Sequence, residues 1–461
     1  MTAHGGHQEY GVNYWETYAP VVSWSSIRFF LIISILSGWY TQQIDFVLAF
    51  PQAQVECDIF LEAPNGFHFK DGISKKTHCL QLLKNLYGTK QGAKVWYDYL
   101  HAGLTKLGYK CSEVDKCVFY KGTAVFLVYT DDGIYIGPDL EEINRLKQEL
   151  IDHGFNIEDM GTLNEYLGVK VTHNGDGTIT LAQPHMIQQI LDDLSFQPST
   201  SSKDTPALSS VVLDRDLHLP PMSPDFDYRS VVGMLNFLEK STRPEMAFAV
   251  HQCARFSANP RTSHAKAIRL IGKYLQGTKE RGIILNPTEH SFESYVDADF
   301  CGLWNPETAM YDPMTSKSRT GFVIMYAGCP LTWASRLQPE TALSTTEAEY
   351  MALSENARTL LPLMDLLEEG KSYGIPIYST TPTVRCRIFE DNAGALELAN
   401  VPKMRPRTRH INQKYHHFRS HVKSGRLKVL AIDTKDQLAD QFTKGLGTQL
   451  FQKLRFRVMG W

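Results

Sequence analysis

The chain has 461 residues, too many for one compact core, so roughly two or three domains are expected. A net charge of −3, with 43% hydrophobic and 21% charged residues, argues against disorder, and eight cysteines without a Cys-x-x-Cys pair disfavour a zinc ribbon or a disulfide framework. The longest apolar run, residues 29–36, is far shorter than the roughly 20 residues of a membrane-spanning helix, and no secretion leader precedes it, which predicts an intracellular protein.

The N-terminal part of the chain alternates helical and strand patterns, which predicts a mixed α/β domain. Expected helices cover residues 25–36, 96–107 and 140–153, and expected strands cover 43–50 and 58–62. Two apolar runs at 123–129 and 134–137 flank Asp131-Asp132-Gly133, so we expect a β-hairpin with both acids at its tip. A second hairpin is expected from 166–172 and 177–183.

The middle of the chain contains the best linker candidate. Residues 198–227 are rich in Ser, Thr, Pro and Asp and show little periodicity. Helical patterns follow at 228–238 and 263–275, and strand-rich sequence begins near Gly282. We therefore expect three parts, covering residues 1–195, 196–285 and 286–461.

A first group of acids lies in the N-terminal part. Asp45 is a lone acid in an apolar strand, and Asp131 and Asp132 are neighbours at the hairpin tip. Buried or adjacent acids are costly for structure alone, although Asp-Asp-Gly is also ordinary turn chemistry. Nucleotidyl transfer uses two divalent metals, and Mg²⁺ prefers carboxylate oxygens, so acids from separate strands must converge on one point. Metal binding and turn formation both remain open at this stage.

A second group of acids lies near the C-terminus, on predicted strands and at predicted helix starts. They are Asp297, Glu349, Asp391 and Asp440. Hydrolysis of an RNA strand uses the same two-metal chemistry with water as the nucleophile, and therefore needs a second cluster of acids. For each acid alone, a role in a helix cap or a turn is the alternative.

Several blocks, in order along the chain, resemble the Pol polyprotein of copia-type LTR retrotransposons (Pseudoviridae). The reverse transcriptase blocks are Glu-Thr-Tyr-Ala-Pro-Val at 16–21, Gln-Ile-Asp-Phe-Val-Leu-Ala-Phe at 43–50, Leu-Tyr-Gly-Thr-Lys-Gln at 86–91, Tyr-Thr-Asp-Asp at 129–132 and Tyr-Leu-Gly at 166–168. The RNase H blocks are Ser-Arg-Thr-Gly at 318–321, Ser-Thr-Thr-Glu-Ala-Glu at 344–349 and Thr-Arg-His-Ile at 408–411.

The resemblance implies an α/β (α+β) fold with an RNA-directed DNA polymerase followed by RNase H. Residues 1–195 would form the palm and partial fingers of a right-hand polymerase, 196–285 a linker and thumb-like helical connection, and 286–461 an RNase H-like mixed sheet flanked by helices. Each catalytic centre would bind two Mg²⁺ or Mn²⁺ ions. The implied ligands are Asp45, Asp131 and Asp132 for polymerisation, and Asp297, Glu349, Asp391 and Asp440 for RNase H. Glu349 is preferred to Glu347 because RNase H enzymes share Glu-x-x-Ala-Leu after the catalytic Glu.

The resemblance also implies binding residues and partners. Phe46, Phe50, Tyr87 and Gly88 would contact the incoming nucleotide, Phe50 by crowding the sugar 2′-position, and Leu167 and Gly168 would hold the primer end. Packed core aromatics are the alternative for Phe50 and Tyr87. The implied partners are an RNA template, a DNA primer, an RNA/DNA hybrid, deoxynucleoside triphosphates and other polyprotein segments, with no membrane, in a cytoplasmic virus-like particle or in the nucleus.

One feature leaves other interpretations open. The family's basic Lys-x-Arg fingers strand should end where Met1 and Thr2 stand, which predicts truncated fingers. The chain is then a full enzyme, an enzyme with RNase H activity only, or a catalytically impaired retrotransposon remnant that binds nucleic acid.

The charge is basic only locally, at 266–273 and at 403–426, where a solvated face is the plain alternative. The second stretch holds His410, His416, His417 and His421. Contact with nucleic-acid phosphate is favoured over zinc there, because no cysteine lies near and the neighbours are Arg and Lys.

Overall fold

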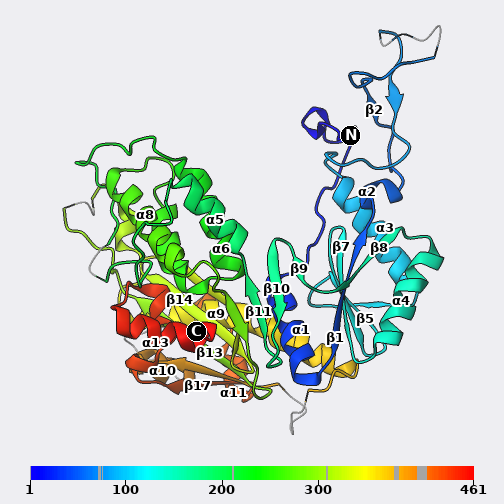
Figure 1. Ribbon diagram of the computed structural model, residues 1–461. Coiled ribbons are helices and arrows are strands. Elements are labelled where there is room, and N and C mark those ends of the chain that lie inside the picture. Colours follow the sequence, from blue (N-terminus) through cyan, green and yellow to red (C-terminus); the bar gives the residue numbers. More distant parts are fainter. Residues whose placement is uncertain are drawn as a thin grey trace. The chain divides into compact units, whose positions relative to one another are not determined.

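The computed structural model of the chain describes residues 2–70, 74, 76–209, 212–307, 310–377, 384–401 and 413–461. The chain forms two compact units, which are coloured along the sequence in Figure 1. Unit 1 contains Met1–Leu163 and Glu369–Ile375, and unit 2 contains Asn164–Glu368 and Pro376–Trp461. The boundaries expected after residues 195 and 285 both fall within unit 2, and the three-part division stays a prediction.

Unit 1 is built on a six-stranded antiparallel sheet with the order β4-β5-β6-β7-β1-β8. Its strands are β1 (Tyr40–Phe46), β4 (Lys110–Cys111), β5 (Val118–Lys121), β6 (Ala124–Tyr129), β7 (Asp132–Gly137) and β8 (Ile157–Thr162). A separate two-stranded hairpin joins β2 (Phe60–Leu61) to β3 (Leu80–Gln81). Strand β1 thus lies between β7 and β8, which brings residues far apart in the sequence to neighbouring strands.

The helices of unit 1 are α1 (Trp24–Ser37), α2 (Ala49–Gln52), α3 (Gly92–Lys106) and α4 (Leu140–His153), with a short 3-10 turn, η1 (Gly5–His7). The apolar residues of α1 are buried around most of its circumference, as expected for a core helix, and Ser23 caps its first turn by accepting from Ser26 N–H. Helices α3 and α4 contribute Trp96 and Leu146 to the main core.

Unit 2 begins with a four-stranded sheet and helices. The sheet order is β12-β11-β10-β9, with β9 (Glu165–Tyr166), β10 (Val169–His173), β11 (Ile179–Ala182) and β12 (Ile283–Leu285). The helices are α5 (Pro184–Asp193), α6 (Tyr228–Ser241), η2 (Pro244–Met246), α7 (Ala247–Ala254) and α8 (Thr262–Gly277). Among the described residues of 198–227 there is no helix or strand, and the role of this segment as a linker stays a prediction.

This linker segment nevertheless packs against unit 2 through specific contacts. The Arg215 guanidinium pairs with buried Asp312 at 3.1 Å, and the backbone N–H of Met222 donates to Pro260 O at 3.1 Å. The polar composition of this segment therefore indicated irregular backbone. The contacts show that its described residues pack against the rest of unit 2.

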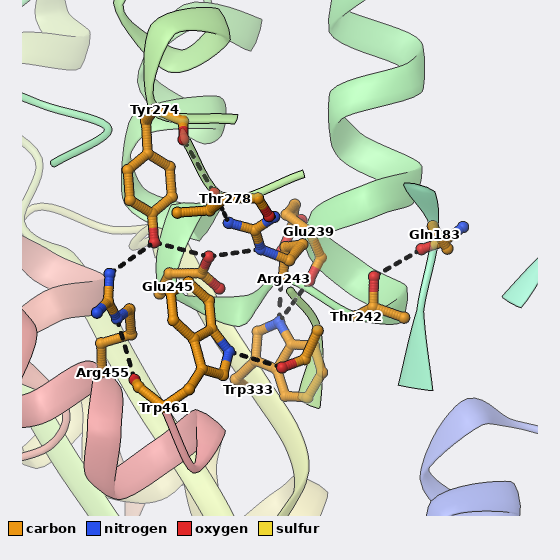
Figure 2. A network of polar contacts seen from close by, with 11 residues as sticks. Gln183, Glu239, Thr242, Arg243, Glu245, Tyr274, Thr278, Trp333, Arg455 and Trp461 are labelled. Atoms are coloured by element: carbon orange, nitrogen blue, oxygen red, sulfur yellow. Dashed lines mark hydrogen bonds and ion pairs between the residues drawn. The ribbon is translucent and has the colours of Figure 1, made fainter. Parts of the chain in front are cut away.

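A buried polar network supports the helical part of unit 2 (Figure 2). The side chains of Arg243 and Glu245 are both fully buried and pair at 2.7 Å, and the Tyr274 hydroxyl donates to Glu245 at 3.1 Å. The Trp461 ring covers the Arg243 guanidinium at 5.5 Å and the Arg455 guanidinium at 3.9 Å. Breaking a buried pair by removing one partner costs about 3–5 kcal/mol. Arg455 of the C-terminal helix donates to the Tyr274 hydroxyl at 3.5 Å, so the network also links that helix to α8.

The rest of unit 2 is a five-stranded mixed sheet with the order β15-β14-β13-β16-β17. Its elements are β13 (Phe292–Asp299), η3 (Pro313–Ser316), β14 (Arg319–Tyr326), β15 (Cys329–Leu337), α9 (Thr345–Ser372), β16 (Cys386–Glu390), α10 (Ala393–Asn400), η5 (Gln413–His416), α11 (Arg419–Lys423), β17 (Leu427–Ala431), η6 (Thr434–Asp436), α12 (Asp440–Thr443) and α13 (Thr448–Met459). Strand β13 is antiparallel to β14 and parallel to β16. Helices α10 and α11 pack against β17 (Figure 1). Helix α12 packs against β14. The expected mixed α/β class is confirmed.

The expected strand beside Asp45 is wrong in extent. The strand predicted at 43–50 ends at Phe46, and α2 begins at Ala49. Leu48 between them has φ +49°, a left-handed conformation that ends an extended strand. Within the described residues, no helix has both the length and the apolarity that crossing a membrane requires.

Candidate active sites

The first candidate site lies where β1 and β7 end in unit 1. Asp45 is the direct cross-strand partner of Asp132, and the backbone N–H of Phe46 donates to Asp131 O at 2.8 Å. Ile44 and Phe46 point into the core, whereas Asp45 and Asp132 are only partly buried. Alternation along β1 therefore places the Asp45 carboxyl on the side of the strand away from the core, beside Asp132.

The predicted β6–β7 hairpin is confirmed, with a correction to its tip. Tyr129 pairs with Asp132, so the turn consists of Thr130 and Asp131, and Asp132 is the first residue of a strand. Thr130 has φ +54°, and its carbonyl accepts a hydrogen bond of 2.6 Å from Trp96 Nε1. The Trp96 contact fixes a turn that a non-glycine residue adopts only at some cost.

Gly133 is required for core packing and does not belong to the turn. A Cβ atom added there would lie 2.7 Å from Phe126 Cε2 and 2.9 Å from Ile44 Cγ1. The Asp-Asp-Gly signature thus has two physical origins: the first Asp belongs to the turn, while glycine leaves room for the core side chains behind the acids.

The acids of unit 1 repel one another. Burial, then the charges of Asp131 and Glu158, raises the pKa of Asp45. Burial, Asp131 and Asp45 raise the pKa of Asp132 to about 6. A divalent cation would relieve this repulsion, and a site of carboxylate oxygens suits a hard cation.

Phe50 and Tyr87 form one aromatic wall. Their rings stack at 4.5 Å between centroids with an interplanar angle of 14°. Burial and the Asp131 charge raise the pKa of Tyr87, against hydrogen bonds from the backbone N–H groups of Phe50 and Ala49. The Tyr87 hydroxyl therefore faces the first turn of α2, within electrostatic range of the acids.

Gly88 is required by close approach of the backbone. It has φ +89°, and an added Cβ would lie 2.1 Å from Ala3 O. The Ala3 N–H donates to Tyr87 O at 2.7 Å, and the Gly5 N–H donates to Gly88 O at 2.9 Å. Residues near the N-terminus thus pair with the backbone of the expected nucleotide-binding block.

The Phe46 ring is buried in the core of unit 1. Its side chain is 1% exposed and packs against Trp96 at 5.2 Å and Phe155 at 5.8 Å. A ring in that position stabilises the core below the acids, and the nucleotide-binding role expected for Phe46 stays a prediction. The sequence did not distinguish it from Phe50 because both are aromatic residues in one motif.

Leu167 and Gly168 belong to unit 2. They form the two-residue turn between β9 and β10, with φ +51° and +72°. Both positive angles are typical of the type I′ turn that matches strand twist. The predicted hairpin of β10 and β11 is also confirmed, with Val171 opposite Leu181.

The second candidate site brings together three of the four predicted RNase H acids. Asp297 on β13, Glu349 on α9 and Asp391 after β16 each offer a ligand atom within 4.8 Å of the others. Among the described residues they form the one group of three or more potential metal ligands this close together, and the acids of unit 1 do not meet this criterion. Strands β13 and β16 are parallel neighbours, so Asp297 and Asp391 lie at the same edge of the sheet.

Asp440, at the start of α12, is the fourth of the predicted acids, and it forms an ion pair with Lys444. Lys444 Nζ lies 2.9 Å from Asp440 Oδ1 and 3.9 Å from Asp297 Oδ2. Thr443 Oγ1 donates to Asp297 Oδ2. Burial and Asp297 raise the pKa of Asp440 to about 7, against the pull of Lys444. Sequence reasoning did not identify Lys444 or Thr443.

The site in unit 2 fits a divalent cation. Burial, followed by the charges of Glu390 and Asp297, holds the pKa of Glu349 well above its usual range. Glu349 Oε2 is buried and, among the described residues, has no hydrogen-bond partner. A buried carboxylate oxygen without a donor is costly, and a bound cation would satisfy it. All the potential ligands here are carboxylates, the donors that hard divalent ions prefer.

Two histidines of the basic segment, His416 and His417, contact side chains of α9. His416 Nδ1 lies 2.7 Å from the Tyr350 hydroxyl, and His417 Nδ1 lies 3.4 Å from Ser354 Oγ. No potential metal group within the described part of the chain contains a histidine. His410 and the block at 408–411 lie outside the described residues.

Comparison with known proteins confirms the resemblance to copia-type Pol polyproteins. Residues 1–209 match the family described as reverse transcriptase (RNA-dependent DNA polymerase). The chain is 29% identical to the retrovirus-related Pol polyprotein from transposon TNT 1-94 of Nicotiana tabacum, over 98% of the chain and 33% of that protein. It is 31% identical to the retrovirus-related Pol polyprotein from transposon RE1 of Arabidopsis thaliana, over 99% of the chain and 30% of that protein. The chain thus spans about a third of the length of these relatives.

Among solved structures, a foamy viral protease-reverse transcriptase in complex with double-stranded DNA is similar at a TM-score of 0.41 and 12% identity. The similarity covers 86% of this chain and 57% of the viral one.

Proposed function

We propose that this chain, whose residues 1–209 match the reverse transcriptase family, is an RNA-directed DNA polymerase with an associated RNase H. The observation that carries the proposal is the direct pairing of Asp45 with Asp132, beside Asp131, within the segment that matches the family. The second carboxylate group, in unit 2, supports the RNase H part.

In unit 1, Asp45, Asp131 and Asp132 would hold Mg²⁺ or Mn²⁺. Two such ions would activate the primer 3′-hydroxyl and neutralise the charge of the triphosphate. The protein supplies the fixed carboxylate geometry of two adjacent strands. The stacked rings of Phe50 and Tyr87 would form the wall that excludes a 2′-hydroxyl from the deoxynucleotide site.

In unit 2, Asp297, Glu349, Asp391 and Asp440 would hold the ions for RNA hydrolysis. Bound divalent ions activate water and stabilise the leaving oxygen. Lys444 holds Asp440 and Asp297 together by its charge, and Thr443 orients Asp297. The substrate would be the RNA strand of an RNA/DNA hybrid.

The partners proposed are an RNA template, a DNA primer and deoxynucleoside triphosphates, with Leu167 and Gly168 at the primer end. Further polyprotein segments are proposed partners, because the chain spans a third of its relatives. The proposed location is a cytoplasmic virus-like particle or the nucleus.

A second candidate function is hydrolysis without polymerisation. It is favoured by one difference between the sites: Asp297, Glu349 and Asp391 of unit 2 offer ligand atoms within 4.8 Å of one another, and the acids of unit 1 are not gathered this closely.

The test is incorporation of deoxynucleotides by the full chain on a primed RNA template, with Mg²⁺ or Mn²⁺. Asp45→Asn serves as the inactive reference, because the amide keeps the shape of the strand and removes the charge. Incorporation that disappears in this variant supports polymerisation. Absence of incorporation with either metal, alongside intact hybrid cleavage, supports the second candidate.

A further inference from the structure

Glu390 is a buried acid that lies beside the proposed RNase H centre. It is the last residue of β16 and immediately precedes Asp391. Along this strand Cys386, Ile388 and Glu390 are buried, so Glu390 occupies a core-facing position and its side chain is 0% exposed. A carboxyl group in such a position is costly unless its oxygens find partners.

One oxygen of Glu390 holds the turn that carries Asp391. Glu390 Oε1 accepts from the backbone N–H of Asn392 at 3.0 Å. Asn392 in turn caps α10, since its side chain accepts from the backbone N–H of Ala395 at 3.0 Å. Asp391 lies between these two contacts, and its Oδ2 accepts from Thr434 Oγ1 at 2.9 Å. The direction of Asp391 is therefore set from both sides.

The other oxygen has no partner among the described residues. Glu390 Oε2 is buried and makes no hydrogen bond to any residue that the structure describes, and the same holds for Glu349 Oε2. Glu390 is the strongest electrostatic neighbour of Glu349, ahead of Asp297 and Asp391. Within the described residues, no basic side chain forms an ion pair with Glu390 or Glu349, whereas Lys444 pairs with Asp440.

We propose that Glu390 is a positioning residue of the metal centre, which fixes the Asp391 turn through Oε1 and accepts a hydrogen bond from a metal-bound water through Oε2. The inference rests on the proposed function of the same site. Groups that hydrogen-bond to metal ligands from outside the coordination sphere change metal affinity by about 10–100-fold when they are removed.

Glu390→Gln separates the two roles. The amide oxygen of Gln can still accept from Asn392 N–H, but an NH₂ group replaces Oε2 and cannot accept from water. Glu390→Met is a second variant, of similar length, that removes both acceptors. Glu293→Gln is the matched control, because Glu293 lies on β13 and pairs with Arg387 at 2.6 Å rather than with the acids of the centre.

The measurement is Mn²⁺ binding to the full chain without nucleic acid, followed by electron paramagnetic resonance. All proteins carry Asp45→Asn and Asp131→Asn, which removes the binding site of unit 1. Glu390→Gln is expected to raise the Kd for Mn²⁺ by about 10–100-fold, Glu390→Met by at least as much, and Glu293→Gln by less than about twofold. Melting of metal-free Glu390→Gln is expected to match or exceed that of the background protein, because an unpartnered buried oxygen is removed.

The outcomes separate this inference from the function on which it rests. Binding that is lost in Asp297→Asn but unchanged in Glu390→Gln overturns the role of Glu390 alone. A background protein that binds no Mn²⁺, or binds it equally with Asp297→Asn, contradicts the metal centre itself and the inference with it. Loss of affinity that occurs only together with loss of the folded state also contradicts a positioning role.

Discussion

Lys444 Nζ lies 2.9 Å from Asp440 Oδ1, so one acid of the proposed RNase H centre already has a cation from the protein. The same ammonium group lies 3.9 Å from Asp297. It therefore lowers the repulsion between two buried carboxyls before any metal binds.

Lys444→Met is expected to destabilise metal-free unit 2 by about 1 kcal/mol, a small value because the Lys444 side chain is 43% exposed. Saturating Mg²⁺ should restore most of this loss, since a bound cation replaces the missing charge. The measurement is thermal unfolding in EDTA and in Mg²⁺. Equal melting of the variant and the parent in EDTA would show that Lys444 does not stabilise the acids.

Asp132 should make metal binding in unit 1 depend on pH. The pKa of Asp132 is raised from 3.8 to about 6 in the folded state. Between these two pH values the metal-free folded protein therefore keeps a proton on Asp132 that the unfolded chain has released. The stability that this proton provides is complete below about pH 4 and is lost as the pH rises through about 6. A metal requires the deprotonated acid, so its binding has the opposite dependence.

In a chain that carries Asp297→Asn and Asp391→Asn, the Mn²⁺ affinity of unit 1 is therefore expected to weaken roughly tenfold per pH unit below pH 6 and to level off above it. Titrations between pH 5 and pH 8 measure this. An affinity that does not change between pH 5 and pH 7 would exclude Asp132 as a ligand.

Phe50→Val should relax the choice of sugar. The substitution removes the ring that stacks on Tyr87 and opens space beside the acids. Ribonucleotide incorporation relative to deoxynucleotide incorporation is expected to rise about 10–200-fold, the range associated with small changes of pocket volume. Phe60→Val on β2 is the control, because that ring is 59% exposed. An unchanged ratio in Phe50→Val would place the sugar elsewhere.

Gly133→Ala tests the packing role of the glycine behind the acids. The added Cβ would meet Phe126 and Ile44 at under 3 Å, so a loss of about 1–3 kcal/mol in the stability of unit 1 is expected, with reduced polymerisation. Gly137→Ala is the matched control on the same strand, where the nearest atom lies at 3.5 Å. Denaturation of the two variants gives the comparison, and equal stabilities would disprove the packing role.

Periodic elements could be predicted from the sequence because their patterns are local. The helix at 140–153 was expected and observed with the same bounds, and the hairpin around Asp131 was expected with only its tip misplaced. The strand at 43–50 was overextended because its apolar run continues past Leu48, where the backbone turns. Helices α5 and α7 were not predicted.

The candidate sites show a different limit. Motifs identified the acids, and the structure brings Asp297, Glu349 and Asp391 together across about a hundred residues of chain. Glu390 and Lys444 could not be predicted, because neither stands in a pattern of its own and their roles depend on which residues fold next to them. Phe46 and Phe50 lie in one motif, and only burial separates the core ring of Phe46 from the partly buried ring of Phe50.

On the proposed function the chain contains two metal-dependent centres, one formed by the acids of unit 1 and one by the acids of unit 2. The most direct test measures primer extension on an RNA template and cleavage of a labelled RNA/DNA hybrid with one preparation in Mg²⁺. We predict that Asp131→Asn abolishes extension and leaves cleavage intact, whereas Asp297→Asn abolishes cleavage and leaves extension intact. Cleavage that survives Asp297→Asn, or extension that survives Asp131→Asn, would contradict the account.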